Sequence, residues 1–189
     1  MNRRLLSGLL LLSLAFSVQA KEFAGVTVED RITSENNETL FLNGMGLREK
    51  FWVDVYVGSL YLAKISDQVA EILSQPSAFR IQLDFIYKEV TREKLLKAWK
   101  EGFEKNQSAQ KQLAMQTKIE QFYALFTESA LKGDRYEMNY VPDTGTRVSK
   151  NGSLLGTIQG KEFSSALLEI WLGNHPADKQ LKKGMLGLN

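Results

Sequence analysis

Arg48 is the residue of this sequence that is best placed for chemistry. It follows a Gly44-Met45-Gly46 step and precedes a strand-like run. Such an arginine would offer a fork of hydrogen-bond donors to a carboxylate or a phenolate at the mouth of a cleft. The two glycines are expected to bend the chain so that Arg48 turns inward. The alternative is an ordinary surface arginine, exposed or paired with a carboxylate, because arginine is rarely buried without a partner.

The sequence lacks the usual patterns of metal, cofactor and serine chemistry. It contains no cysteine and one histidine, His175, which precedes Pro176 at an expected helix end. These residues cannot build a tetrahedral zinc site. The glycine steps do not have the spacing of dinucleotide or phosphate loops, and no serine lies in a G-x-S-x-G turn. We therefore predict no metal and no cofactor, and we interpret His175 as a cap or a solvated turn residue.

The first twenty residues have the composition of a secretory signal peptide. Arg3 and Arg4 precede an apolar stretch, Leu5 to Val18, and Ala20 is a suitable cleavage point. A retained membrane anchor is the weaker alternative, because the stretch is too short to span a bilayer. Cleavage would leave 169 of the 189 residues, the size of one domain. We predict a signal peptide over residues 1–20, one domain over residues 21–189, and a periplasmic location.

The charge balance argues against a nucleic-acid partner. The chain has 24 basic and 22 acidic side chains, and two of the basic ones, Arg3 and Arg4, lie in the predicted signal peptide. The mature domain would then carry 22 of each sign, without the positive field that attracts polyanions. We also predict no transmembrane segment in the mature chain, and the sequence does not indicate an oligomeric state.

Hydrophobic periodicity predicts the elements that must position Arg48. The order is strands, then helices, then strands, then helices, which is not an alternating βαβ repeat. It indicates an α+β fold, an antiparallel β-sheet packed against a layer of helices. Strands are expected over residues 25–32, 38–43, 51–62, 78–87 and 134–142, and a hairpin over 146–158 should turn at Asn151-Gly152. Helices are expected over residues 67–73, 91–106, 115–126 and 163–171, with a short final helix opened by Pro176.

Large aromatic side chains recur at helical or strand spacing along the whole domain. Each is expected to belong to the core, because large side chains dominate burial. Together they predict an apolar cleft between the sheet and the helices. They are Trp52, Tyr56, Tyr61, Trp99, Phe103, Phe122, Phe126, Phe163 and Trp171.

Four segments resemble the chalcone isomerase-like family. The stretch LNGMGLREKFWVDVYVGSLYL resembles its G-x-G-x-R step and following strand, and FRIQLDFIYKEVTREKLLKAWKEGF is similar to its strand-to-helix passage. IEQFYALF and ALLEIWLGNHPADKQLKKGMLG resemble its later helix and closing helix pair. The similarity covers most of Thr39 to Leu188 and is strongest to a short, exported bacterial branch. It implies an open-faced β-sandwich, an antiparallel sheet packed against helices.

The resemblance also implies roles for individual residues. Plant members close a chalcone to a flavanone, related members bind fatty acids, and in both the arginine matching Arg48 holds the anion of the ligand. The strand threonine of the enzymes falls on Tyr56. The helix tyrosine, the helix asparagine and the closing-helix Ser/Thr fall on Leu95, Gly102 and Ile170. Each missing donor to a developing oxyanion would raise the activation barrier by ~3–4 kcal/mol, so little cyclase activity is expected.

Three functions follow as hypotheses. The first is a non-catalytic periplasmic protein that binds an apolar or amphipathic, fatty-acid-like ligand, with Arg48 and Tyr56 at its acidic end. The second is a chalcone isomerase-type intramolecular lyase, in which Arg48 stabilises phenolate or enolate charge. The third is a structural or partner-binding envelope protein without a ligand. In that case Arg48 is expected to pair with Asp54 or Glu49, and the aromatic side chains fill the cleft.

Overall fold

The computed structural model describes residues 20–74 and 77–188. The predicted signal peptide therefore lies outside the described residues, apart from Ala20. The strands are β1 (Ala20–Phe23), β2 (Val26–Glu29), β3 (Arg31–Thr33), β4 (Thr39–Lys50), β5 (Val53–Leu62), β6 (Phe79–Phe85), β7 (Glu89–Val90), β8 (Ala130–Leu131), β9 (Arg135–Val141), β10 (Gly145–Lys150) and β11 (Ser153–Ile158). The helices are α1 (Val69–Ser74), α2 (Arg92–Asn106), α3 (Ala109–Ala114), α4 (Gln116–Ala124), α5 (Lys161–Leu172) and α6 (Lys179–Met185).

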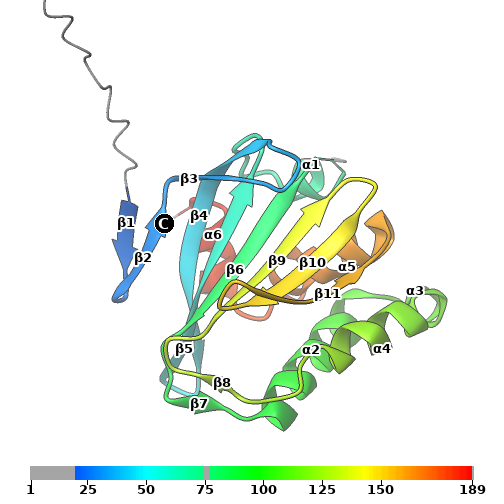
Figure 1. Cartoon of the computed structure of the whole chain (residues 1–189). Helices are drawn as coiled ribbons and strands as arrows, with labels where there is room; N and C mark the ends of the chain where they lie inside the picture. Colours follow the sequence, from blue (N-terminus) through cyan, green and yellow to red (C-terminus); the bar gives the residue numbers. More distant parts are fainter. Residues whose placement is uncertain (1–19, 75–76, 189) are drawn as a thin grey trace, which may run out of the picture.

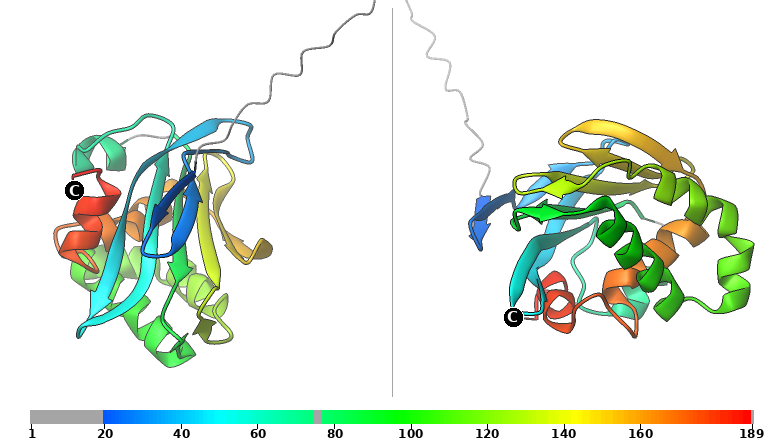
Figure 2. Two further views of the ribbon diagram at one scale, coloured as in Figure 1. Left: turned by 90° about the vertical axis from the view of Figure 1, so that its left-hand side faces the viewer. Right: turned by 90° about the horizontal axis from the view of Figure 1, so that it is seen from below.

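Seven strands form one curled antiparallel sheet, in the order β11-β10-β9-β6-β5-β4-β3. Helices cover its inner face, while the hairpin of β1 and β2 lies beside the opposite side (Figures 1 and 2). The predicted α+β fold is thereby confirmed. No helix in the described part of the chain is long and apolar enough to cross a membrane.

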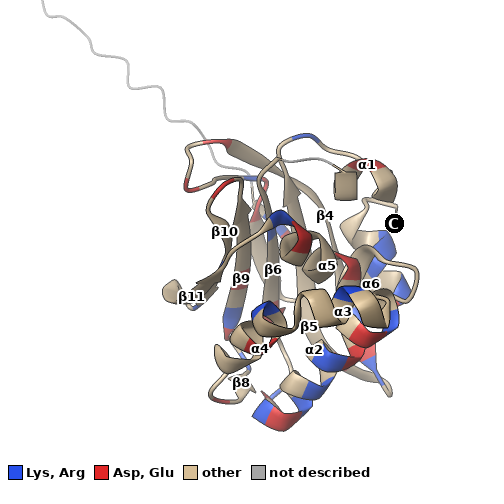
Figure 3. Cartoon of the chain, turned by 90° about the vertical axis from the view of Figure 1, so that its right-hand side faces the viewer, with Lys and Arg blue, Asp and Glu red and all other residues tan. Residues whose placement is uncertain are grey.

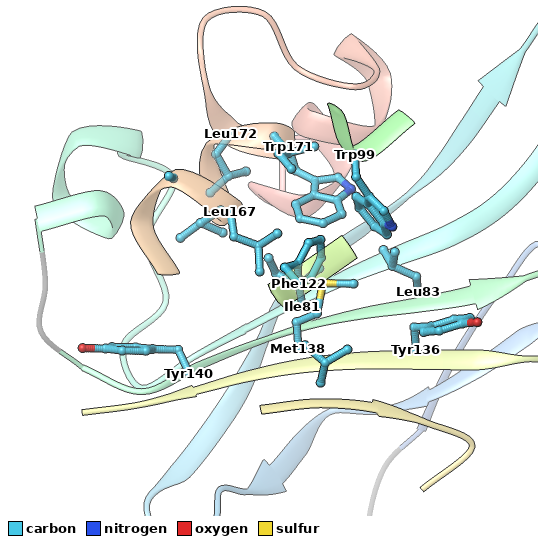
Figure 4. Close-up of a cluster of buried hydrophobic side chains, with 14 of the residues drawn as sticks. Ile81, Leu83, Trp99, Phe122, Tyr136, Met138, Tyr140, Leu167, Trp171 and Leu172 are labelled. Carbon is cyan, nitrogen blue, oxygen red and sulfur yellow. The ribbon is translucent and has the colours of Figure 1, made fainter. Parts of the chain in front are cut away.

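The period-two pattern of β6 explains how the sheet faces the helices. Phe79, Ile81, Leu83 and Phe85 all join the main hydrophobic core, as the alternation predicts. The core also contains the apolar face of α2, which begins after the N-cap Thr91. Figure 4 shows this cluster, in which side chains of β6 and β9 meet those of α2, α4 and α5.

The outer face of the sheet is polar over its centre. Arg80 pairs with Glu137 at 2.9 Å, and the Nε of Arg135 lies 2.6 Å from Asp84. Tyr61 belongs to a separate, smaller apolar cluster on this side, and its hydroxyl donates to a β2 carbonyl at 3.0 Å. Both faces of the central strands are therefore covered, which is why β6 is almost wholly buried.

Several predicted boundaries are wrong. The first expected strand is divided into β2 and β3. The helix expected over residues 115–126 corresponds to α4, and the short helix α3 that precedes it was not expected. The last helix begins at Lys179 rather than at Pro176, because Asp178 caps it by accepting from two backbone amides at 2.7 and 2.9 Å. The turn at Asn151-Gly152 is confirmed, and both residues have positive φ.

The largest difference lies between the second and third predicted strands. β4 continues through Arg48 to Lys50, which pairs with Val53, so the connection to β5 is the two-residue turn Phe51–Trp52. The prediction that Trp52 belongs to the core is wrong, since it is 94% exposed and Phe51 is 85% exposed. Both turn residues have positive φ, 52° and 65°. Such turns favour Asn-Gly, and nothing in the residue types of this turn predicted it.

Gly44 and Gly46 were expected to bend the chain towards Arg48. Both lie within β4, whose pairing with β5 shifts register between Leu42 and Gly44. A Cβ on Gly44 would lie 2.1 Å from the carbonyl oxygen of Gly184, and one on Gly46 would lie 3.0 Å from the Cα of Leu181. The physical reason for the glycines is therefore the close approach of the α6 backbone to the strand.

The Phe51–Trp52 turn provides a test of backbone strain. Replacement by Asn-Gly should raise the free energy of unfolding by about 2–4 kcal/mol before the loss of ring contacts, because a left-handed conformation costs each of the two bulky residues roughly 1–2 kcal/mol. The contact of Lys50 with the Phe51 ring, at 5.9 Å, offsets about 0.5 kcal/mol. Urea unfolding of the wild type and the double variant measures the change. A variant less stable than the wild type would contradict it.

Candidate functional site

Arg48 lies on the helix-covered face of β4, directly opposite Tyr56 of β5. Its side chain is half-buried, and Nη1 donates a hydrogen bond to the carbonyl oxygen of Ala177 in the connection between α5 and α6. Arg48 forms no ion pair with any described residue, so the expected pairing with Asp54 or Glu49 is wrong. The partners of this cation are therefore neutral, namely the Ala177 carbonyl and the Tyr56 side chain.

Tyr56 lies beside Arg48 and is almost completely buried, with 8% of its surface exposed. Its hydroxyl accepts a hydrogen bond from Nε1 of Trp171 on α5 at 3.0 Å. Burial raises the pKa of Tyr56 above its ordinary value of 10.0, and the positive charge of Arg48 offsets only part of that effect. The phenol is therefore neutral at physiological pH.

Trp171, which donates to the Tyr56 hydroxyl, packs deeper in the core against a second tryptophan, Trp99. The ring centroids of Trp171 and Trp99 lie 5.7 Å apart in an edge-to-face arrangement, and both are drawn in Figure 4. Nε1 of Trp99 is buried and has no hydrogen-bond partner among the described residues. Buried donors of this kind are rare, because each loses its hydration without replacement.

The three positions that the resemblance matched to lost catalytic groups are all buried. Leu95 and Gly102 belong to the buried face of α2, and Ile170 to that of α5. The structure brings two of them together, since a Cβ on Gly102 would lie 2.8 Å from Cγ2 of Ile170. Ile170 therefore fills the space that the missing side chain leaves. This part of the inner face offers apolar surface and no side-chain donor from these three residues.

The α5–α6 connection that covers Arg48 is fixed from several sides. The side chain of Asn106 donates to the carbonyl of His175 and accepts from its amide, both at 3.0 Å. Ala177 donates to the carbonyl of Ile170 at 2.8 Å, and Nζ of Lys182 donates to that of Gly173 at 2.9 Å. Sequence reasoning did not identify this connection as part of the site. The only signal was the His175-Pro176 pair, which marks a turn but not its neighbours.

Charges on the helical layer alternate in sign (Figure 3). Along α2, Lys97 and Glu101, Lys100 and Glu104, and Glu101 and Lys105 lie 3.9, 3.9 and 3.6 Å apart. Such exposed pairs contribute a few tenths of a kcal/mol each and largely cancel one another's field at a distance. An anion near Arg48 would therefore be recognised by local contacts.

Two surface hollows on the described residues lie away from Arg48 and Tyr56. One, of about 450 Å³, lies between α4 and β11 and is lined by Thr117, Lys118 and Gln121, among others. The other, of about 420 Å³, lies on the polar outer face beside Asp84 and Arg135. On the inner face, the region between the sheet and helices α2 and α5 is occupied by side chains of the core.

The curled antiparallel sheet with helices on its inner face gives this protein an α+β fold of the chalcone isomerase type. The chain belongs to the chalcone isomerase-like family, whose sequence profile matches residues 20–187. Among solved structures it is similar to the Arabidopsis thaliana fatty-acid binding protein AtFAP1, with a TM-score of 0.65 and 16% identity. The match covers 89% of this chain and 96% of AtFAP1, and at this identity it establishes the fold. No curated protein sequence matches the chain.

Removal of the Tyr56 hydroxyl should destabilise the protein. In Tyr56→Phe the buried Nε1 of Trp171 loses its acceptor, so the free energy of unfolding should fall by about 1–3 kcal/mol. Tyr140→Phe is a matched control, because the Tyr140 hydroxyl makes no hydrogen bond among the described residues. Urea unfolding compares the two variants, and an equal effect in both would contradict this account.

Alkaline pH should reduce the difference between the wild type and Tyr56→Phe. The folded state raises the pKa of Tyr56, so above pH 10 the unfolded chain releases this proton while the folded chain keeps it. The stability linked to the neutral phenol is complete below pH 10 and is lost as the pH rises through the folded pKa. Urea midpoints of both proteins at neutral pH and above pH 10 measure the gap. A gap that stays constant would show that Tyr56 does not titrate in this way.

Proposed function

We propose that this protein is a non-catalytic, periplasmic member of its family that binds a small apolar molecule with an acidic end, of the fatty-acid class. The observation that carries the proposal is the environment of Arg48. A half-buried guanidinium whose backbone partner is neutral can readily donate hydrogen bonds to a carboxylate. The similarity of the fold to a fatty-acid binding protein supports the same ligand class.

A carboxylate would compete directly with the Ala177 carbonyl for Arg48. A charge-assisted bond to a carboxylate is roughly twice as strong as one between neutral groups, and a carboxylate can accept two donors of the guanidinium at once. Tyr56 lies opposite Arg48 and stays protonated, so its hydroxyl could also donate to the anion. The same two residues were the candidates from the sequence.

Binding would require the α5–α6 connection to move. Ala177 contacts Arg48, and core side chains occupy the space between α2 and α5, so an acyl chain has to displace part of this packing. The unpaired Nε1 of Trp99 marks a place in the core where a polar atom would be stabilised. Ligand binding should therefore be accompanied by a change in the environment of the buried tryptophans.

The residues at the former catalytic positions support a role without catalysis. Leu95, Gly102 and Ile170 supply no side-chain donor to a developing negative charge, which leaves Arg48 and Tyr56 as the polar pair. The isomerase alternative predicts a loss of chalcone absorbance faster than the spontaneous rate. We expect no acceleration by this protein.

A second candidate function is that of a structural or partner-binding protein without a small ligand. The observation in its favour is the filled core, in which aromatic rings pack against one another between sheet and helices. Under this hypothesis Arg48 fixes the α5–α6 connection through Ala177 and has no other role.

Fatty-acid titration of wild type and Arg48→Met tests the first function. Methionine keeps an unbranched apolar stem but removes the charge, so affinity should fall by about 10- to 100-fold, the value of one hydrogen bond to a charged group. Arg92→Met is the matched control, because Arg92 also donates to a backbone carbonyl, that of Phe126 at 2.9 Å, but lies at the start of α2. Its affinity should equal that of the wild type.

Native mass spectrometry of protein purified from its own cells provides the second test. Co-purified fatty acid in the wild type but not in Arg48→Met would support ligand binding at Arg48. Equal, negligible affinity in the wild type and both variants, with no co-purified lipid, would exclude the first function and favour the second.

A further inference from the structure

The Phe51–Trp52 turn displays two large aromatic rings at the tip of the β4–β5 hairpin. The side chains are 85% and 94% exposed, the highest values among the exposed large apolar residues. Both residues also adopt the left-handed conformation that bulky side chains avoid. Packing within the protein does not explain the exposure and the strain, because neither ring contacts a core residue among the described ring contacts. We propose that this turn inserts into the headgroup region of a lipid membrane.

The size and shape of the patch favour a lipid surface over a protein partner. Two aromatic side chains bury roughly 300–500 Å² together. A stable protein interface needs about 800 Å² on each partner. The two rings alone are therefore too small to bind a second copy of this chain or another protein stably. A protruding pair of rings needs no complementary pocket in a bilayer, and tryptophan is enriched at the membrane–water interface, where one edge stays wet.

Exposed charged residues of both signs lie at the end of the molecule that carries the two rings. The loop beside β5 starts where the amides of Ile86 and Tyr87 donate to Val55 at 3.0 and 3.1 Å, and it leads into β7, which pairs with β8. Figures 1 and 2 show these strands at the same end of the molecule as the β4–β5 turn. The exposed charges there are Lys50, Lys88, Lys132, Glu49, Asp54 and Glu89.

Because these charges balance, they suit zwitterionic headgroups, which carry both a phosphate and an ammonium group. Attraction should therefore come from burial of the rings rather than from a net positive surface. This sets the turn apart from a polybasic anchor, whose binding depends on anionic lipid and falls with salt.

The same hairpin carries the candidate anion site. Arg48 precedes Phe51 by three residues, which is about 10 Å along an extended strand. A turn held in the headgroup region would keep the pair of Arg48 and Tyr56 close to the membrane surface, where the carboxylate of a membrane-dissolved fatty acid lies. This consequence for ligand uptake rests on the proposed function, whereas membrane binding itself does not.

Tryptophan fluorescence can report the insertion directly. Of the three tryptophans, Trp99 and Trp171 are 4% and 1% exposed, so a change on adding vesicles reports mainly Trp52. Vesicles of phosphatidylcholine should shift the emission to shorter wavelength and protect Trp52 from aqueous quenchers. Addition of phosphatidylglycerol or salt should change binding little. Trp52→Phe should still co-sediment with vesicles but lose the shift.

The decisive variant replaces Phe51–Trp52 by Asn-Gly. This change removes both rings while relaxing the backbone, so the variant should be at least as stable as the wild type and a loss of binding cannot be assigned to misfolding. Vesicle affinity, measured by co-sedimentation, should fall at least about tenfold. Leu113→Ser, which removes a 72% exposed leucine from α3, is the matched control and should bind like the wild type.

Two results would overturn the proposal. One is equal vesicle binding, or none, in the wild type and the Asn-Gly variant. The other is a Trp52 shift that depends on protein concentration without vesicles, which would assign the turn to self-association. Titration with free fatty acid in detergent-free solution separates the two proposals. The Asn-Gly variant should keep its fatty-acid affinity, and Arg48→Met should keep its vesicle binding.

Discussion

The close approach of the α6 backbone to β4 is the constraint on which the candidate site depends. The Gly184 carbonyl occupies the space that a Cβ on Gly44 would need, so any larger residue there would force helix and strand apart. Asn43 fixes the same contact by donating from Nδ2 to the Met185 carbonyl at 2.8 Å. With α6 held against the sheet, the connection that precedes it must run across the strand. That path places the Ala177 carbonyl on Arg48.

A second constraint comes from the aromatic core behind Arg48. The hydrogen bond between Trp171 and Tyr56 ties α5 to β5, and the edge-to-face contact of Trp171 with Trp99 ties α5 to α2. Gly102 and Ile170 complete this packing, because the isoleucine fills the space over the glycine. These two residues, which the resemblance aligns with polar groups of the enzymes, therefore also make the inner face a continuous apolar core.

The parts of the fold that were predictable are those that depend on local sequence. The alternation in β6 and the Asn151-Gly152 turn follow from strand periodicity and from residues that accept positive φ. Arg48 was identifiable because its glycine-rich context is unusual, but its partner was not, because Ala177 is 129 residues away and contributes only a backbone carbonyl. The role of the glycines was misjudged for a related reason. A glycine that admits another backbone and a glycine that bends the chain look the same until the packing is known.

The β4–β5 turn failed prediction because local preference was overridden there. Residue types favour a strand through Phe51 and Trp52, and turn chemistry would place Asn-Gly at two successive residues with positive φ. Strain of this kind persists only where the surrounding structure enforces it, and it occurs disproportionately at functional positions. Here the paired strands on either side fix the length of the turn, and the contact of Lys50 with the Phe51 ring offsets only about 0.5 kcal/mol of the cost. A chain that holds two rings in solvent at a cost in stability gains little from them within its own fold, and this is the reason to look for their role in a contact outside it.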